Sequence, residues 1–259
     1  MLTPPQYTLP MNVESLKNKI GTYQSWLDDA RAACADPDFP WYRYGSLSNF
    51  THLDNLLTGA NRSITELAGG QTIVDIGAAD GDTAFALAKE GFHLQIVDHA
   101  ATNMNGLRGA RLLNDFLKLG VSIHDVNLDA QFQLPEQRYG LAIFLGILYH
   151  LKNPYLVLEN LAQRAQHAIV STRIARFIPT QASGVAVDKI ALAYLLDAGE
   201  ANGDATNYWI FSEAGLRRIF HRTGWDVIDF MLVGDLAASN PIENNHDERA
   251  FALLRSRVF

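Results

Sequence analysis

The nine residues VDIGAADGD, from Val74 to Asp82, have the pattern of a loop that holds a nucleotide-derived ligand. They follow a β-branched run and precede a helical pattern, where glycine lets the backbone approach a ligand closely. A dinucleotide fingerprint needs glycines two and five residues after Gly77, but Ala79 and Asp82 stand there. Ala78 and Ala79 are small enough to keep the turn compact. The loop therefore fits a nucleoside better than a pyrophosphate.

Three aspartates in and around the loop indicate the charge of its ligand. A helix N-terminus attracts pyrophosphate through free N–H groups and its positive dipole end, and Asp80 and Asp82 would repel that anion. A sulfonium and an ammonium group suit the loop better, which favours S-adenosylmethionine, with Asp75 facing its ammonium group directly or through water. The alternative is that all three acids are turn or cap residues. Asp82 is expected to cap the following helix in either case.

Two further acids end the next two strands. Asp98 ends HLQIVD, seventeen residues after Gly81, where an acid accepts hydrogen bonds from both ribose hydroxyls. Asp125, in VSIHDV, is positioned to accept a hydrogen bond from the adenine amino group. His99 is expected to touch the nucleoside or solvent. Because the carboxyl ends of parallel strands meet at one crevice, these acids predict a nucleoside site there.

The elements that position these residues alternate β-branched runs with helical patterns, which predicts a parallel sheet covered by helices. Strands are expected at 71–76, 93–98, 121–126, 139–146 and 167–172, helices at 83–90, 104–120 and 154–165, and a loop or short helix between the third and fourth strands. Residues 173–210 hold the helix-like piece VAVDKIALAYLLDAG and no clear strand, as expected of an insertion that covers a site.

The end of the chain distinguishes between two α/β folds. A helix at 212–224, capped by Ser212 and Gly224, precedes strands at 225–234 and 249–256, which the polar stretch SNPIENNHDE joins into a hairpin. A dinucleotide-binding fold would end on another parallel strand. Five strands connected by helices and followed by a hairpin are instead the arrangement of class I S-adenosylmethionine-dependent methyltransferases.

We therefore expect an α/β, Rossmann-like class I methyltransferase fold. Its mostly parallel seven-stranded sheet would carry a C-terminal antiparallel hairpin and an insertion after the fifth strand. Residues 1–68 would form an N-terminal helical cap that contains the amphipathic stretch SLKNKIGTYQSWLDDARAAC, and residues 69–259 the methyltransferase domain.

From Gln71 to Phe259 the chain resembles the class I methyltransferase family. Within that family, FLGILYHLKNPYLVLENLA (144–162) looks like the motif after the fourth strand in the tRNA wobble-uridine carboxymethyltransferases and their uncharacterised relatives. WIFSEAGLRRIFHRTGWDV is similar to their final helix and strand. The resemblance implies that the following residues bind the donor: Gly77, Ala79 and Gly81 in the loop, Asp98 at the ribose, Asp125 and Val126 at the adenine, and Leu145 and Gly146 at the end of the fourth strand.

The resemblance also implies that Tyr149 reaches toward the reactive end of the donor. The tRNA-modifying relatives use a carboxylated form of S-adenosylmethionine, which calls for basic and aromatic groups ahead of the glycine loop. The segment WYRY (41–44) offers three aromatic groups and one arginine but no lysine cluster. The formal net charge of −7 fits a tRNA partner poorly, since affinity for nucleic acid depends on lysine and arginine.

Methyl transfer is an in-line displacement, so the protein must chiefly align the reactants and exclude water. A general base is needed only where the proton of the acceptor is tightly held. His150 is the candidate base, since its pKa lies near working pH, or else a structural histidine with a backbone hydrogen bond. Tyr149 would orient the acceptor or the methionine part of the donor. Arg173, Tyr208 and Trp209 would bind an anionic or planar acceptor, or pack against the cap.

The composition narrows the function classes. A content of 48% hydrophobic and 19% charged residues without a biased tract is typical of a soluble globular protein. The single cysteine, Cys34, excludes an internal disulfide framework and favours a reducing, cytoplasmic setting. The longest apolar stretch, 141–148, is too short to span a bilayer, and the N-terminus lacks the pattern of a signal peptide. No histidine pair has metal-ligand spacing, so no metal is expected.

Three functional hypotheses remain. The first is an enzyme that moves a methyl group from S-adenosylmethionine to an oxygen or nitrogen of a small-molecule or sugar-like acceptor and leaves S-adenosylhomocysteine. The second is a tRNA wobble-uridine modifying enzyme. The third is a catalytically silent nucleoside-binding subunit that regulates a partner.

Overall fold

The structure is a computed structural model that describes residues 10–179, 184–236, 238–242 and 247–259. Residues 243–246, in the polar stretch expected to join the last two strands, lie outside these ranges, as do residues 180–183 of the predicted insertion.

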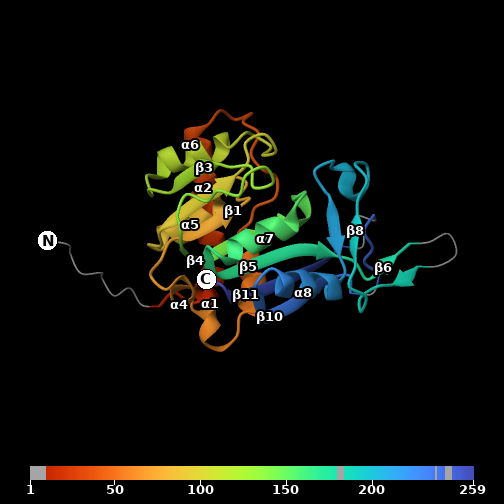
Figure 1. Cartoon of the computed structure of the whole chain (residues 1–259). Coiled ribbons are helices and arrows are strands. Elements are labelled where there is room, and N and C mark those ends of the chain that lie inside the picture. The colour runs from red at the N-terminus through yellow and green to blue at the C-terminus, as the bar shows by residue number, and fades with distance from the viewer. Residues whose placement is uncertain (1–9, 180–183, 237, 243–246) are drawn as a thin grey trace.

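The sheet that runs through the molecule (Figure 1) has nine strands among the described residues, and seven of them lie in the order β10-β11-β5-β4-β1-β2-β3. Strands β1 to β5 are parallel, and β11 runs antiparallel to both β5 and β10. The strand bounds are Ile73–Ile76 (β1), Leu94–Asp98 (β2), Ser122–Asp125 (β3), Tyr139–Leu145 (β4), Ala165–Ile174 (β5), Trp225–Gly234 (β10) and Glu248–Ser256 (β11). The predicted fold, including the antiparallel C-terminal pair, is confirmed.

Side chains that alternate along the strands build a separate core on each face of the sheet. On one face Ile73, Ile96 and Leu141 pack with the helices that come before β4 in the chain, and on the other Val74 and Phe144 pack with the later helices. The first group is α1 (Val13–Asn18), α2 (Ile20–Cys34), α3 (Asn49–Leu56), α4 (Ile64–Ala68), α5 (Asp82–Lys89) and α6 (Arg108–Leu117); the second is α7 (Pro154–Ala162) and α8 (Glu213–Arg222).

The predicted N-terminal cap is helical, and its stretch SLKNKIGTYQSWLDDARAAC falls on α1 and α2. Leu16 of α1, Leu27 of α2 and Phe50 of α3 are buried in the same core as the first face of the sheet, and α2 contacts α6. The cap therefore packs as part of the methyltransferase domain, and a domain boundary at 68/69 stays a prediction. No described helix is long and apolar enough to cross a membrane.

The caps of α8 follow their sequence signals. The Ser212 hydroxyl accepts a hydrogen bond from the backbone N–H of Gly215 at 3.0 Å, as an N-cap does. Gly224 has φ +92° and directly follows the C-cap residue Thr223. Between β3 and β4 the chain forms turns and loop and no helix.

The prediction of a helix-like insertion without a clear strand is wrong. Short strands β6 (Phe177–Ile178) and β7 (Val185–Ala186) pair with each other. Strand β8 (Ala193–Leu195) pairs with β9 (Trp209–Phe211), which joins the main sheet beside the end of β5. The piece VAVDKIALAYLLDAG thus contributes β7 and β8, because pairing with distant segments overrides its local helical pattern. Figure 1 shows the insertion at the right, beyond the end of β5.

Candidate functional site

The first three strands bring the predicted loop and acids to one edge of the sheet. Asp98 and Asp125 are register partners at the ends of β2 and β3. The backbone N–H of Gly77 donates to Val97 O at 2.9 Å, and that of Val126 donates to Asp98 O at 2.9 Å. The glycine loop and both strand-end acids therefore meet at adjacent carboxyl ends, where ligands of open α/β sheets bind.

The glycine loop turns through three residues with positive φ. Gly77 has φ +71° and Gly81 has φ +86°. Ala79, at the position of the middle glycine in a dinucleotide pattern, has φ +55°. The chain keeps the left-handed turn there with an alanine, at a cost of about 1 kcal/mol. A Cβ at Gly77 would lie only 2.7 Å from Cδ1 of Ile147, so glycine is required at that position.

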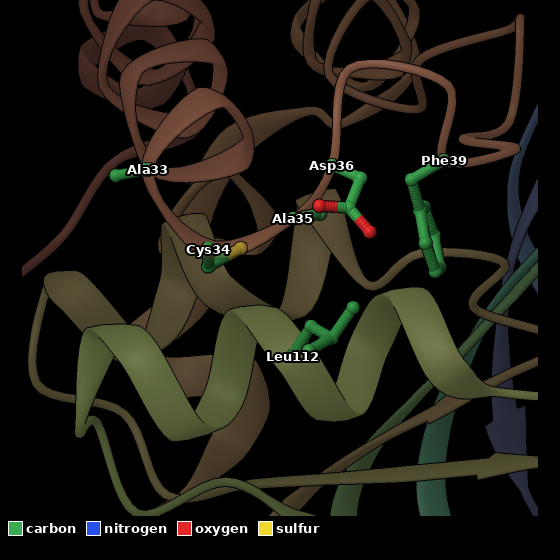
Figure 2. Close-up of a pocket in the computed structure, with 6 residues that line it drawn as sticks. All are labelled: Ala33, Cys34, Ala35, Asp36, Phe39 and Leu112. Carbon is green, nitrogen blue, oxygen red and sulfur yellow. The ribbon is translucent and has the colours of Figure 1, made fainter.

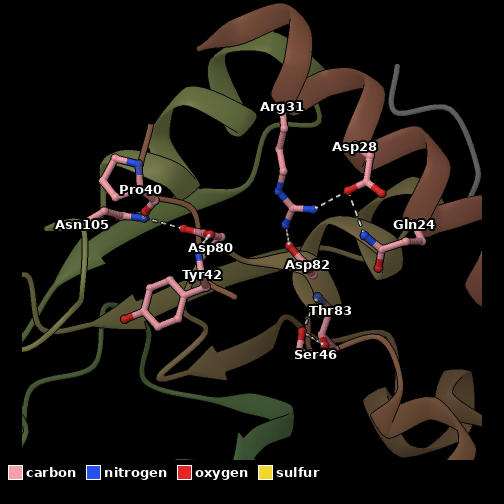
Figure 3. A network of polar contacts seen from close by, with 10 residues as sticks. All are labelled: Gln24, Asp28, Arg31, Pro40, Tyr42, Ser46, Asp80, Asp82, Thr83 and Asn105. Carbon is pink, nitrogen blue, oxygen red and sulfur yellow. Dashed lines mark hydrogen bonds and ion pairs between the residues drawn. The ribbon is translucent and has the colours of Figure 1, made fainter. Parts of the chain in front are cut away.

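Two acids of the loop hold N-terminal elements (Figure 3): Asp80 binds the segment 39–46, and Asp82 binds α2. Asp80, which is 2% exposed, accepts hydrogen bonds from the backbone N–H of Tyr42 and from Asn105 Nδ2, both at 2.7 Å. Asp82 forms an ion pair with Arg31 of α2. The guanidinium carbon of Arg31 in turn lies 5.4 Å from the ring centroid of Trp41. The two carboxylates that were predicted to repel a phosphate are therefore bound by protein groups: Asp82 by the charge of Arg31, and Asp80 by hydrogen bonds from Tyr42 and Asn105.

The prediction that Asp82 caps α5 is wrong. Gly81 is the N-cap residue and makes no side-chain capping bond, while Asp82 begins the helix with its carboxylate committed to Arg31. The capping acceptor comes from a distant segment, since Ser46 Oγ accepts a hydrogen bond from Thr83 N at 3.2 Å and contacts Thr83 Oγ1 at 2.7 Å.

Asp75 lies beneath the loop at the end of β1. Its side chain is buried and accepts a hydrogen bond from the backbone of Ala84 in the first turn of α5. Burial raises the pKa of Asp75 to about 7, and the nearby charges of Asp98 and Asp82 act in the same direction. Contact between Asp75 and a ligand ammonium group, directly or through water, stays a prediction.

Asp98 is tied to the loop by Asn103, a residue that the sequence did not single out. Its carboxylate accepts hydrogen bonds from His99 N at 2.7 Å and Asn103 Nδ2 at 3.0 Å, and Asn103 Nδ2 also lies 3.3 Å from Ala79 O. Burial raises the pKa of Asp98, and these hydrogen bonds oppose the rise. Asn103 thereby fixes Asp98 relative to the loop.

Asp125 is the exposed member of the pair of acids, with 46% of its side-chain surface accessible. Its Oδ1 accepts a hydrogen bond from Ala100 N at 2.9 Å and lies 3.3 Å from His99 Nδ1. The bond from Ala100 lowers the pKa of Asp125, so the carboxylate is ionised at neutral pH. His99 thus contacts both acids, and its predicted contact with the nucleoside or solvent stays a prediction.

A second group of predicted residues lies at the end of β4. Gly146 directly follows β4 with φ +72°, and Leu145 is half-buried. A methyl group placed on Gly146 would lie 3.7 Å from Tyr149 Oη and 3.9 Å from Arg249 Nη1. Arg249, which the sequence did not single out, thus reaches the same backbone position as Tyr149 from the start of β11.

His150 follows Tyr149 in a 3₁₀ turn, Leu148–His150, and their ring centroids are 4.3 Å apart. His150 Nδ1 lies 3.2 Å from Thr206 O and 3.0 Å from Thr206 Oγ1. Because a carbonyl only accepts, Nδ1 carries the proton and Nε2 the lone pair. Burial lowers the pKa of His150, although the charge of Asp204 opposes this, so the ring is neutral at pH 7. Both the structural and the basic interpretation of His150 fit this arrangement.

The three residues predicted to bind the acceptor are engaged by the protein itself. Arg173 Nη2 donates to Asn240 O at 2.9 Å, and its Nε lies 3.3 Å from Asp247 Oδ1. The backbone N–H of Tyr208 donates to Tyr149 O at 2.8 Å, and Trp209 Nε1 lies 3.2 Å from Lys152 O. Tyr208 and Trp209 hold the insertion against the segment after β4, and an acceptor role for the three residues stays a prediction.

A surface pocket between the end of α2 and α6 is lined by Ala33, Cys34, Ala35, Asp36, Phe39 and Leu112 (Figure 2). None of the predicted site residues lines it, so it is separate from the strand-end site. Among the described ranges, no group of three His, Cys, Asp or Glu side chains is placed to hold a metal ion.

Comparison with known proteins assigns the family. The sequence matches a family model described as a methyltransferase domain over residues 51–229. A search of curated proteins finds no match. The fold is similar to the N-terminal domain of EvdMO1 with SAH bound, at 13% identity and a TM-score of 0.55, over 97% of this chain and 100% of that one.

Two further solved structures share the fold. The [4+2]-cyclase SpnF is 11% identical, with a TM-score of 0.52 over 96% of this chain and 98% of that one. TehB from Haemophilus influenzae is 11% identical, with a TM-score of 0.50 over 81% of this chain and 67% of that one. At such identities the likeness concerns the fold alone. The comparisons lend no support to the tRNA wobble-uridine subgroup.

The matched model and the strand-end site define one class of protein, the methyltransferases with a Rossmann-like sheet. The chain belongs to the methyltransferase domain family, and it is an S-adenosylmethionine-dependent methyltransferase. The residues present fit that donor, because Asp98 and Asp125 offer carboxylates at neighbouring strand ends.

Proposed function

We propose that the protein transfers a methyl group from S-adenosylmethionine to an oxygen or nitrogen of a small-molecule or sugar-like acceptor. One observation carries the proposal: the loop that begins at Gly77, the acid pair Asp98 and Asp125, and the Gly146–Tyr149 group all lie at carboxyl ends of neighbouring parallel strands. This arrangement offers one half of the crevice to a nucleoside and the other half to an acceptor.

The hydrogen-bonding groups at the strand ends support the proposed binding of the donor. Asp98 is proposed to accept the ribose hydroxyls, while Asp125 and Val126 border the adenine. The backbone of Gly77, Ala78, Ala79 and Gly81 is proposed to approach the methionine part, with Asp75 below it. When bound, the donor supplies a methyl carbon activated by a positive sulfur, so the tasks of the chain are alignment and exclusion of water.

Proton removal is assigned to His150. A neutral imidazole whose Nδ1 proton is held by Thr206 presents Nε2 as a base, which an acceptor hydroxyl would require. Tyr149, whose ring lies beside His150, is proposed to orient the acceptor or the methionine part of the donor. An amine acceptor would make the base dispensable.

Two observations support a small-molecule or sugar-like acceptor: the net charge of the chain and the similarity of its fold to one solved structure. The formal net charge of −7 disfavours a tRNA partner, which remains the alternative acceptor. The N-terminal domain of EvdMO1, 13% identical, was crystallised in the presence of SAH and D-fucose. A sugar panel is therefore the first set of acceptors to screen.

Calorimetric titration of the purified protein with S-adenosylmethionine, S-adenosylhomocysteine and NAD tests the proposal. Both adenosyl ligands are expected to bind and NAD to fail. Asp98→Ala is expected to weaken donor binding at least about 100-fold, because two charge-assisted hydrogen bonds are lost.

Asp115→Ala, at an exposed acid of α6, is the matched control and should leave donor affinity unchanged. Binding of NAD without the adenosyl ligands would overturn the donor assignment. Donor binding without turnover on any sugar, small-molecule or tRNA acceptor would favour the silent regulatory subunit.

A further inference from the structure

A chain of hydrogen bonds runs from the ring of His150 into the insertion. His150 Nδ1 lies 3.0 Å from the hydroxyl oxygen of Thr206, and that hydroxyl donates to Asp204 Oδ1 at 2.7 Å. The backbone N–H of Thr206 donates to the same carboxylate oxygen at 2.8 Å. Because the hydroxyl proton of Thr206 is directed at Asp204, its lone pairs face the N–H of the imidazole. Thr206 thus links the ring of His150 to a carboxylate.

This link exceeds what is needed to hold the ring in place. The structure contains a simpler arrangement at His167, whose Nδ1 lies 3.1 Å from Leu67 O. His150 has such a carbonyl too, Thr206 O at 3.2 Å from Nδ1, so the hydroxyl and the carboxylate come in addition. His150 Nε2 has no hydrogen-bond partner among the described residues and is not one of their buried unpartnered atoms. The ring is therefore fixed at Nδ1 while Nε2 stays accessible.

The charges around His150 give the link an effect on its basicity. Burial and the charge of Arg249 lower the pKa of His150, whereas Asp204 and the backbone of Thr206 raise it. Burial raises the pKa of Asp204, but hydrogen bonds from Thr206 outweigh this and hold the pKa below its usual value, so the carboxylate is ionised at neutral pH. A hydroxyl polarised by an anion accepts more strongly from a ring that becomes positive. The insertion thus supplies the negative charge that a protonated His150 needs.

The insertion also fixes Thr206 relative to the ring. On one side of Thr206 in the chain, the backbone N–H of Tyr208 donates to Tyr149 O at 2.8 Å. Asn207, which is 4% exposed, donates through Nδ2 to Ala201 O at 2.8 Å. These bonds clamp the residues around Thr206 to the turn that carries His150. The alignment of the three groups is therefore built into the packing of the insertion.

We infer that Thr206 and Asp204 are positioning residues that make His150 a general base, and that the methyl acceptor therefore reacts through a hydroxyl group. This assignment rests on the proposed function and narrows it, because an uncharged amine needs no base. His150 Nε2 takes the hydroxyl proton as the oxygen–methyl bond forms and the methyl–sulfur bond breaks. The Nδ1 proton stays on the ring, Asp204 stays ionised, and the proton on Nε2 later leaves to solvent.

The link is tested without turnover by the pKa of His150, which NMR titration measures in the unloaded protein. Thr206→Val removes the hydroxyl and keeps the carbonyl that fixes the ring, and should lower the pKa of His150 as Asp204→Asn does. Because Asp204 acts through Thr206, the double variant should shift the pKa by less than the sum of the two single shifts. Thr206→Ser should restore the wild-type value.

Thr51→Val, at an exposed threonine of α3, is the matched control and should leave the pKa of His150 unchanged. The pKa of His167, which is fixed by a carbonyl, should not move in any variant. Thermal melting of each variant is measured, and Thr206→Ala replaces Thr206→Val if the latter does not fold. An unchanged pKa of His150 in the threonine variant, or single shifts that add in the double variant, would overturn the link.

The acceptor class is tested by methyl transfer from S-adenosylmethionine to paired compounds, D-galactose against D-galactosamine and phenol against aniline. We expect O-methyl products, identified by mass spectrometry. In Thr206→Val, kcat for them should fall about tenfold with KM unchanged, because the link acts on proton transfer, and Thr206→Ser should restore it. Transfer to nitrogen alone, a kcat that Thr206→Val leaves unchanged, or donor binding with no transfer to any of the four compounds would overturn the hydroxyl assignment.

The proposed function and this assignment fail in different measurements. Loss of binding to all adenosyl ligands in the calorimetric titration would refute the proposed function. The pKa comparison needs neither donor nor acceptor, so it decides independently whether Asp204 acts on His150 through Thr206.

Discussion

The two halves of the crevice are built in different ways. In the half proposed for the donor, Gly77 directly follows β1 while Asp98 and Asp125 end β2 and β3, and the pairing of these strands places them side by side. In the half proposed for the acceptor, Tyr149 contacts Arg249, a hundred residues further on in the chain, and His150 contacts Thr206 of the insertion. The donor half is thus encoded locally, whereas the acceptor half depends on long-range packing.

The segment 39–46 is an exception within the donor half, because it reaches the glycine loop from a distant part of the sequence. It and α2 are held by buried polar contacts to Asp80 and Asp82, so the loop depends on the N-terminal helices. A local signal therefore places the loop, while a long-range network fixes its conformation.

The largest expected effect comes from breaking this network at its ion pair. Asp82→Asn leaves the guanidinium of Arg31, which is 14% exposed, without its main countercharge. We expect a loss of about 3 kcal/mol in the free energy of unfolding, measured by urea denaturation, because an uncompensated buried charge remains. Donor affinity should fall as the segment 39–46 loosens.

Asp28→Asn is the matched control, since Asp28 also pairs with Arg31 but is 56% exposed. Its expected effect is below about 1 kcal/mol. Equal losses in unfolding free energy in the two variants would show that the burial of Asp82 does not strengthen its ion pair with Arg31.

The second prediction concerns the pH dependence set by Asp75. Its pKa is about 7 in the folded protein against a usual value of 3.8, so between these values the folded state holds the proton that the unfolded state has lost. Stability contributed by Asp75 is therefore present below pH 4 and declines as pH rises to 7. Between pH 5 and pH 7, the unfolding free energy of the wild type should fall by about 2 kcal/mol relative to Asp75→Asn.

Urea denaturation at several pH values measures this difference. A constant gap between the wild type and Asp75→Asn from pH 5 to pH 8 would contradict the raised pKa. Because a ligand ammonium group favours the ionised carboxylate, donor affinity of the wild type should also increase through this range, and the increase should vanish in Asp75→Asn.

The third prediction compares two positions of the glycine loop. Gly77→Ala places a Cβ against Ile147 in a backbone with φ +71° and should destabilise the fold by about 2 kcal/mol. Ala79→Gly relieves an existing left-handed alanine and should stabilise the fold by less than about 1 kcal/mol. Thermal melts of the two variants should therefore shift in opposite directions. A loss in both would mean that the Ala79 side chain makes packing contacts worth more than its backbone strain.

The sequence alone predicts some of these features and not others. The strand order, the loop and the acids Asp98 and Asp125 could be predicted, because hydrophobic periodicity and residues at strand ends are local signals. The roles of Asp80 and Asp82 could not, since their partners Tyr42, Asn105 and Arg31 lie in distant segments. The same reason hid Arg249, whose neighbour Tyr149 is a hundred residues away. The strands of the insertion were missed because the pairing of β7 with β6 and of β8 with β9 overrides the helical pattern of its apolar residues.

The smallest expected effect tests the long-range construction of the acceptor half through His150. The carboxylate of Asp204, in the insertion, raises the pKa of His150 against the lowering effect of burial. Asp204→Asn removes this charge but keeps a side-chain oxygen that can accept the hydrogen bonds from Thr206, so the pKa of His150 should move further below its usual value. Titration of the ring proton signals by NMR measures the change, with Asp197→Asn, at an exposed acid of the same insertion, as control.

Donor affinity should stay constant in both variants, because Asp98 and Asp125 receive no contact from the insertion among the described residues. An unchanged pKa of His150 in Asp204→Asn would show that the insertion positions the ring by packing alone, and a loss of donor affinity would show that the two halves of the crevice are coupled.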